Sequence, residues 1–328
     1  MKKFVTIFPH YRNLHFYKDP GQIPYRFKNK GWVAELVCFK SEESYLHTNY
    51  LPIVTVPTMR FDIGLIWYLV KTSRKIDVLN VYHFQWRSLW LAFIYKLLNP
   101  KGVSYLKMDN CNNCGPYPWE CLFDKQIEIK HYFLQQSNTI KHRLKNKIIP
   151  FLARHIDLYS IEDQESSDYY ENKYPVFRNK IITALNGHAI DLLKQDIKLK
   201  SFEEKENLII TVGRLGTHQK NTLSLLKGYA STAKEHKWNL VLAGPIDKDF
   251  VADKDEFFNS HPELESRICF VGNLEKPELF DLYNRAKIFI LPSNFEAFAN
   301  EYSEAAFFGN LIITSPFTSF KHLIIEEK

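Results

Sequence analysis

The chain has 328 residues, of which 45% are hydrophobic; this is long for a single domain and predicts two. Its net charge of +6 is uneven, because residues 1–195 carry 27 Lys and Arg against 17 Asp and Glu, and residues 196–328 carry 16 against 20. The basic first half is either a solvated surface or faces an anionic partner such as membrane lipid, a lipid-phosphate acceptor or nucleic acid. There is no secretory signal and no apolar run near the ~20 residues that span a bilayer. We therefore expect a cytoplasmic protein, with peripheral contact to the inner face of the membrane as an option.

The first half alternates between strand and helix patterns. Apolar runs predict strands at residues 4–8, 33–39, 77–82, 103–108, 156–160 and 181–185. Helical spacing predicts helices at residues 24–30, 61–74, 86–98 and 164–173, and an interrupted one over 121–153, with a loop at 10–21. Such alternation is typical of a doubly wound parallel sheet.

The five cysteines are Cys38, Cys111, Cys114, Cys121 and Cys269. An odd number without a secretory signal favours free thiols. Cys111 and Cys114 have the spacing of the first half of a zinc site, but no second pair follows, so incidental thiols are the favoured interpretation.

A charged segment at residues 196–207 predicts a linker, after which a second α/β unit begins. Strands are expected at 208–212, 239–243, 268–271, 288–291 and 311–314, and helices at 221–233 and 277–285. We thus predict two Rossmann-like domains, 1–195 and 196–328, facing a cleft.

Two carboxylates lie near the last two strands. Glu296 falls in the loop after the strand at 288–291, and Glu304 falls eight residues later inside a helix. A helix N-terminus at the carboxyl edge of a parallel sheet attracts an anion, and carboxylates beside it suit the hydroxyls of a polyol. This combination predicts a site for a nucleotide-sugar.

Cations follow the first strand of the second half. Gly213 allows a ligand to approach the backbone closely, and Arg214 and Lys220 supply positive charge. Such charge would stabilise a diphosphate, including the one that departs when a glycosidic bond breaks.

These segments together resemble retaining glycosyltransferases of family 4, which have the GT-B fold. The resemblance rests on Glu296-x7-Glu304 after Leu291-Pro292-Ser293, on LIITVGRL (208–215) followed by Gln219-Lys220-Asn221, and on Asn186-Gly187 with Asp191. It covers residues 180–318 well and the first half in outline. The resemblance implies that domain 1–195 binds the acceptor and domain 196–328 binds the nucleotide-sugar donor. Family members usually continue beyond the strand at 311–314, so the second domain is expected to be shortened.

The resemblance assigns Glu304 to the ribose hydroxyls, Glu296 to the donor sugar, and the backbone N–H groups around Ala297–Asn300 to sugar and phosphate. The expected donor-binding residues are Gly213, Arg214, Lys220, Glu296, Phe298, Ala299, Asn300 and Glu304. The usual Gly-Phe-Gly of the family is here Ala297-Phe298-Ala299.

The first half lacks the histidine that the family often places beside the donor sugar. Lys107 and Asp109 stand there instead. Asp109 either hydrogen-bonds a sugar or acts as a base on the acceptor hydroxyl, or it caps a loop. His83 is a second candidate, although a structural role is favoured, and the Asp19-Pro20-Gly21 loop is a candidate border of the acceptor site.

We expect a retaining glycosyltransferase in surface polysaccharide biosynthesis. Catalysis would involve Glu296, Arg214, Lys220 and Asp109. The donor would be a UDP- or GDP-sugar and the acceptor a glycan or lipid-linked hydroxyl, with no metal cofactor and no nucleic acid partner. The D-x-D pairs at 247–249 and 253–255 read as solvated surface. The alternatives are a nucleotide-sugar epimerase of the same architecture and a non-catalytic glycan-binding or scaffold subunit.

Overall fold

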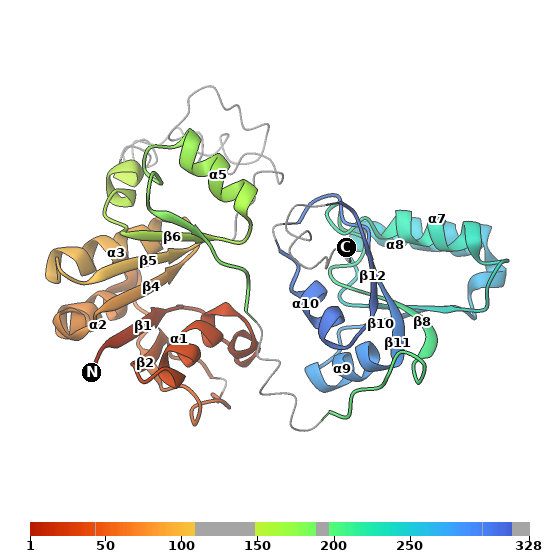
Figure 1. Ribbon diagram of the computed structural model, residues 1–328, viewed down its shortest axis with the longest axis horizontal. Helices are drawn as coiled ribbons and strands as arrows, with labels where there is room; N and C mark the ends of the chain where they lie inside the picture. The colour runs from red at the N-terminus through yellow and green to blue at the C-terminus, as the bar shows by residue number, and fades with distance from the viewer. Residues whose placement is uncertain (43, 109–147, 188–196, 297, 317–328) are drawn as a thin grey trace, which may run out of the picture. The chain divides into compact units, whose positions relative to one another are not determined.

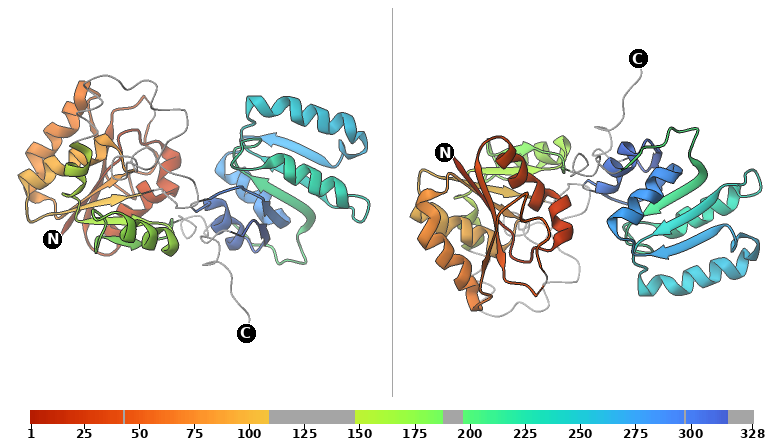
Figure 2. Two further views of the ribbon diagram at one scale, coloured as in Figure 1. Left: turned by 90° about the horizontal axis from the view of Figure 1, so that it is seen from above. Right: turned by 90° about the horizontal axis from the view of Figure 1, so that it is seen from below.

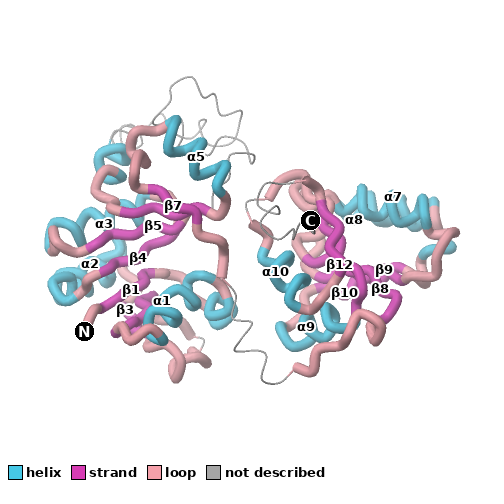
Figure 3. The backbone as a smooth tube through the Cα atoms, in the orientation of Figure 1, coloured by secondary structure: helices cyan, strands magenta, loops and turns pink. Residues whose placement is uncertain are grey.

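The structure is a computed structural model that describes residues 1–42, 44–108, 148–187, 197–296 and 298–316 (Figure 1). The chain divides into two compact units, Met1–Ala189 and Ile190–Lys328. The predicted domain boundary at 195/196 falls within residues 188–196, outside the described part. Each unit contains one sheet with helices around it, as Figure 3 shows.

The sheet of the first unit has the strand order β3-β2-β1-β4-β5-β6-β7, and every pair is parallel. The strands are β1 Lys3–Ile7, β2 Val33–Phe39, β3 Ile53–Val56, β4 Val78–Tyr82, β5 Val103–Lys107, β6 Leu158–Ile161 and β7 Ile181–Thr183. From β1 the chain builds outward to β2 and β3, then returns to place β4 on the other side of β1. The pair β1/β4 is therefore the point where the strand order reverses, which is where open sheets usually bind ligands.

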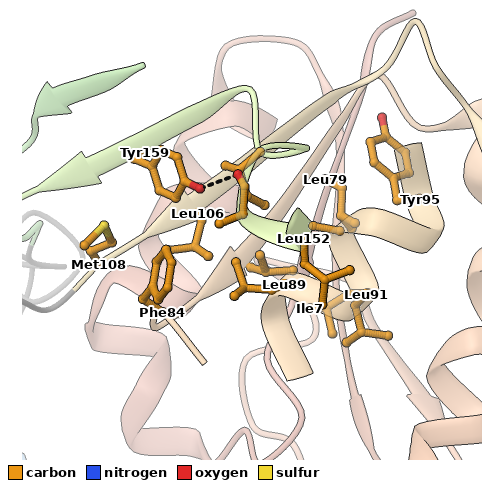
Figure 4. Close-up of a cluster of buried hydrophobic side chains, with 14 of the residues drawn as sticks. Ile7, Leu79, Phe84, Leu89, Leu91, Tyr95, Leu106, Met108, Leu152 and Tyr159 are labelled. Atoms are coloured by element: carbon orange, nitrogen blue, oxygen red, sulfur yellow. Dashed lines mark hydrogen bonds between the residues drawn. The ribbon is translucent and has the colours of Figure 1, made fainter. Parts of the chain in front are cut away.

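The helices of this unit are α1 Asp19–Asn29, α2 Ile63–Thr72, α3 Trp86–Leu98 and α5 Gln164–Lys173, and residues 148–153 are also helical. Alternate residues of a strand face opposite sides of the sheet. On β1, Phe4 stacks on Phe27 of α1 with ring centroids 4.1 Å apart, whereas Val5 and Ile7 enter the core that packs against α2 and α3. Figure 4 shows this core, where the hydroxyl of Tyr159 donates a 2.6 Å hydrogen bond to the Ala153 carbonyl.

In the first unit, one predicted helix start was wrong and one strand was missed. Helix α1 begins at Asp19 rather than at 24, because Pro20 and Gly21 belong to its first turn. A Cβ on Gly21 would lie 2.4 Å from the Cα of Phe16, so this glycine permits close packing rather than a turn. Strand β3 was not predicted, and most of the predicted helix at 121–153 lies outside the described residues.

The sheet of the second unit has the order β10-β9-β8-β11-β12, again all parallel. The strands are β8 Glu206–Val212, β9 Asn239–Ala243, β10 Ile268–Gly272, β11 Ala286–Leu291 and β12 Leu311–Thr314. The helices are α7 Thr222–Thr232, α8 Val251–Ser260, α9 Lys276–Arg285 and α10 Asn300–Phe307. One core cluster joins the sheet to α9 and α10 and another joins it to α7 and α8, so the sheet lies between two helix layers, which can be followed in Figure 2.

The predicted parallel α/β architecture is thus confirmed in both units. The D-x-D segments are partly helical, with Asp253 and Asp255 inside α8. This helix was not predicted because the segment is highly charged. Short 3₁₀ turns occupy Asn13–Tyr17, Arg60–Asp62, Ser73–Lys75, Lys248–Phe250 and Pro262–Leu264. Within the described residues, every helix is too short or too polar to cross a bilayer.

Candidate functional site

Two loops meet at the carboxyl edge of the second sheet. One follows β8 and the other follows β11, and these strands are neighbours at the point where the strand order reverses. The backbone N–H of Asn294 donates to the carbonyl of Gln219 at 2.7 Å, and its side chain donates to the carbonyl of His218 at 2.6 Å. These two hydrogen bonds fasten the loops together.

Lys220 and Glu296 form a buried ion pair between these loops. The Lys220 ammonium lies 2.6 Å from Glu296 Oε1, and the two side chains are 9% and 5% exposed. The same oxygen accepts a hydrogen bond from Ser293 Oγ at 2.7 Å, and Oε2 accepts one from Gln219 Nε2 at 3.2 Å. An ammonium has three donor hydrogens, so Lys220 can hold Glu296 and still donate to an anionic ligand.

Arg214 joins this group through Gln219. Its Nη2 donates to Gln219 Oε1 at 2.6 Å, and the arginine itself is exposed. Gly213 makes room for Lys220, since a Cβ at Gly213 would lie 3.1 Å from Lys220 Cε. The structure thus connects three predicted residues, Arg214, Lys220 and Glu296, by a continuous chain of hydrogen bonds.

The other predicted donor-binding residues surround the start of α10. Phe298 and Ala299 are buried, Ala299 provides no side-chain cap, and α10 begins at Asn300. The first amides of a helix without a side-chain cap are available to a ligand. Among the described residues, the buried Asn300 Oδ1 has no hydrogen-bond partner. Ala297 lies outside the described residues.

Glu304 is buried within α10 and forms a second ion pair, with Lys276. Lys276 is the first residue of α9, and its ammonium also lies 5.2 Å from the ring centroid of Phe280. Burial, followed by the neighbouring Glu304 and Glu301 carboxylates, raises the pKa of Tyr283. The sequence did not indicate Lys276, because the predicted helix began one residue later and the pairing joins two separate elements.

In the first unit, Lys107 lies at the end of β5, as predicted, but it is enclosed. Its side chain is 1% exposed and lies 3.3 Å from Asp19 Oδ2 and 3.7 Å from Glu162 Oε1, and it donates to the Ala184 carbonyl at 2.9 Å. The backbone of Gly187 donates to Asp19 Oδ1 at 2.7 Å. Asp19 therefore begins α1 and helps to hold this cluster. Glu162 was missed, although it follows β6 as directly as Met108 follows β5. Asp109 lies outside the described residues.

A small cavity of about 140 Å³ opens at the carboxyl ends of β1 and β4. His10, His83 and Arg87 are among its polar lining residues. Arg87 Nη1 lies 3.4 Å from His10 Nε2, while its Nε donates to Asp62 Oδ2 at 2.9 Å. His83, a candidate in the sequence, has a φ of 60° and lines this cavity.

The described residues contain no group of three or more His, Cys, Asp or Glu side chains that could hold a metal ion. Asp247 accepts a 3.0 Å hydrogen bond from the backbone of Asp249 and caps a short turn. Cys38 and Cys269 are free thiols, and Cys111, Cys114 and Cys121 lie outside the described residues.

Comparison with known proteins agrees with this architecture. The family "Glycosyl transferases group 1" matches residues 194–328. A Campylobacter jejuni enzyme, named as a GalNAc-α-(1→4)-GalNAc-α-(1→3)-diNAcBac-PP-undecaprenol α-1,4-N-acetyl-D-galactosaminyltransferase, is 30% identical over 277 residues, which are 80% of this chain and 71% of that protein. The chain belongs to the glycosyl transferases group 1 family, and it is therefore a glycosyltransferase.

Two solved structures share the fold at low sequence identity. Anabaena HepE in complex with UDP has a TM-score of 0.64 and 14% identity, covering 99% of this chain and 84% of that one. The catalytic domain of starch synthase IV from Arabidopsis thaliana, bound to ADP and acarbose, has a TM-score of 0.65 and 12% identity, covering 99% and 85%. The fold is accordingly of the GT-B type, as the sequence motifs predicted.

Proposed function

We propose that this glycosyltransferase moves a sugar, with retention of anomeric configuration, from a nucleoside diphosphate to a hydroxyl of a lipid-linked glycan. The observation that carries the proposal is the buried Lys220–Glu296 pair, fastened at the strand-order reversal of the second unit and extended to Arg214 by Gln219. In this arrangement, Lys220 and Arg214 are cations that can bind a diphosphate, and Glu296 is a neighbouring carboxylate that can bind sugar hydroxyls. Glu304 would take the ribose hydroxyls.

The roles follow from the charges. Lys220 and Arg214 would neutralise the diphosphate, whose negative charge grows as the glycosidic bond breaks, and the N-terminus of α10 would add backbone donors. Glu296, held in place by Lys220, would bind donor-sugar hydroxyls. These groups would supply the charge neutralisation that a divalent metal provides elsewhere, so we expect activity to survive EDTA.

The acceptor side of the proposal rests on the first unit. The Campylobacter relative is named for an undecaprenol-diphosphate-linked acceptor, and the basic first half of this chain suits such an anionic lipid. The cavity beside His10, His83 and Arg87 lies at the ligand-binding edge of its sheet. We place the acceptor at this edge, in surface polysaccharide assembly, with Asp109 as the candidate base and peripheral contact with the membrane.

The experiment is a transfer assay with UDP- and GDP-sugars and an undecaprenyl-diphosphate-linked glycan, with the anomeric configuration of the product read by NMR. Retention supports the proposal, and inversion contradicts the assigned stereochemistry. Donor turnover without acceptor would point to an epimerase. Failure to bind any nucleotide would instead favour a scaffold subunit.

A further inference from the structure

We propose that the outer face of α2 and the turn before it dock the first unit onto an anionic lipid surface. This inference rests on the proposed function, since a lipid-linked acceptor requires the enzyme to work at a membrane. The α2 face consists of Met59, Phe61, Ile63, Trp67 and Val70, which are 49, 82, 46, 58 and 50% exposed. Scattered exposed apolar side chains are normal, but five within twelve residues form a patch that marks an interaction site.

Helix α2 is apolar on both sides. Leu65 and Leu69 are fully buried in the core against the sheet. Ile63, Trp67 and Val70 are four and three residues apart, so they share the opposite face of the helix. A helix that needed only to cover the sheet would carry polar residues on that face. Its apolar character therefore indicates a further partner.

The turn before α2 presents Phe61 to solvent. Phe61 and Asp62 both have φ near 57°, a left-handed conformation that is rare for bulky residues and costs free energy. The salt bridge from Arg87 to Asp62 holds the turn in this conformation. A strained turn that exposes a phenylalanine is expected where the side chain has a binding role.

The charged residues around the α2 face favour an anionic lipid surface, and not a protein, as its partner. Residues 59–75 contain four basic residues, Arg60, Lys71, Arg74 and Lys75, and one acid, Asp62, which Arg87 already neutralises. The Lys71 ammonium lies 4.9 Å from the ring centroid of Trp67. Aromatic and aliphatic side chains bordered by lysine and arginine are typical of surfaces that lie in the headgroup layer of anionic membranes.

The α2 face is connected by side-chain contacts to the cavity of the first unit. Asp62, which adjoins Phe61, contacts Arg87, and Arg87 lines the cavity at the carboxyl ends of β1 and β4. Helix α2 lies beside α3, whose first turn carries Arg87 (Figure 1). The α2 face is thus linked through Asp62 and Arg87 to the edge of the sheet where we place the acceptor.

The test uses the full chain in co-sedimentation with vesicles of phosphatidylcholine alone and of phosphatidylcholine with 30% phosphatidylglycerol. We expect binding to the anionic vesicles that weakens in high salt, and a loss of at least tenfold in Phe61→Ser/Trp67→Ser. The control Leu46→Ser changes an equally exposed residue (69%) of the same unit and should bind as wild type. Arg74→Gln/Lys75→Gln should weaken binding only to the anionic vesicles.

Calorimetric titration with nucleotides separates this inference from the proposed function. Nucleotide binding without vesicle binding overturns the docking inference alone. Vesicle binding without nucleotide binding supports docking and counts against the proposed function. Light scattering that shows a dimer in wild type and a monomer in Phe61→Ser/Trp67→Ser would identify the face as a protein interface instead and would overturn the inference.

Discussion

Lys220 and Glu296 stand 76 positions apart in the chain, yet their charged groups meet at 2.6 Å in a buried site. Removing one partner of such a pair leaves the other charge buried, which costs about 3–5 kcal/mol. We expect Lys220→Met to lower the free energy of unfolding of the second unit by about this amount. The double variant Lys220→Met/Glu296→Gln should be clearly more stable than the sum of the two single variants implies. Additive losses in urea unfolding would show that the two residues do not interact.

Glu304 should recognise ribose. In Glu304→Gln a charged acceptor becomes neutral, and a hydrogen bond to a charged group contributes about 1.5–3 kcal/mol, or roughly 10- to 150-fold in affinity. Wild type should prefer UDP to 2′-deoxy-UDP, and the variant should lose most of that preference. Glu301→Gln, on the same helix, is the matched control and should keep it. Equal discrimination in all three proteins would remove the assignment.

Lys276 should act as a positioning residue for Glu304, since it pairs with this carboxylate from the first turn of α9. Lys276→Met is expected to weaken nucleotide binding about tenfold and to reduce discrimination against the 2′-deoxy analogue. Lys276→Arg should restore much of both because it keeps the charge. A residue needed only for folding would lower stability in Lys276→Met and leave the ratio of the two affinities unchanged.

Two glycines of the second unit should respond to alanine in opposite ways. Gly244 has a φ of +133°, and a Cβ there would lie 1.9 Å from the carbonyl oxygen of Gly213. Gly244→Ala should therefore push apart the backbone that supports Lys220 and cost several kcal/mol. Gly228 lies within α7 with nothing near its missing Cβ, so Gly228→Ala should stabilise by about 0.5–1 kcal/mol. Thermal unfolding of both variants checks the contrast.

We expect the contribution of Lys205 to the free energy of unfolding to rise with pH. Burial, with a smaller effect of Lys200, lowers the pKa of Lys205 to about 8, below the value of about 10.4 in an unfolded chain. At a pH between these two pKa values, the unfolded chain binds more protons than the folded chain. The contribution of Lys205 to the free energy of unfolding therefore increases as pH rises. The difference in stability between wild type and Lys205→Met should shift in favour of wild type from pH 7 to pH 9. A flat or opposite trend would contradict the shifted pKa.

Sequence patterns predicted the regular elements well where a single face or run of the chain determines them. Helices Trp86–Leu98 and Gln164–Lys173 and strands Val33–Phe39 and Asn239–Ala243 were predicted at their observed bounds. Strand β3 was missed because Pro52 and Pro57 flank only four residues. The start of α1 was missed because Pro20-Gly21 resembles a turn until the packing of Phe16 against Gly21 is known.

In the candidate site, too, some contacts could be anticipated from the sequence and others could not. The loop positions of Lys220 and Glu296 follow from their strands, so their proximity could be anticipated. The pairings of Glu304 with Lys276 and of Lys107 with Asp19 and Glu162 depend on how separate elements pack, which no local pattern records. The sequence could also not indicate that Ser293 donates a hydrogen bond to Glu296.

The most direct test is calorimetric titration of UDP, GDP and ADP into wild type, Lys220→Met, Glu304→Gln and the control Arg285→Gln. Arg285 pairs with Glu206 at the opposite edge of the same sheet, where β8 begins. We expect one nucleotide to bind wild type and the control alike and to lose about tenfold or more in affinity for both site variants. Unchanged affinity in both site variants would contradict it.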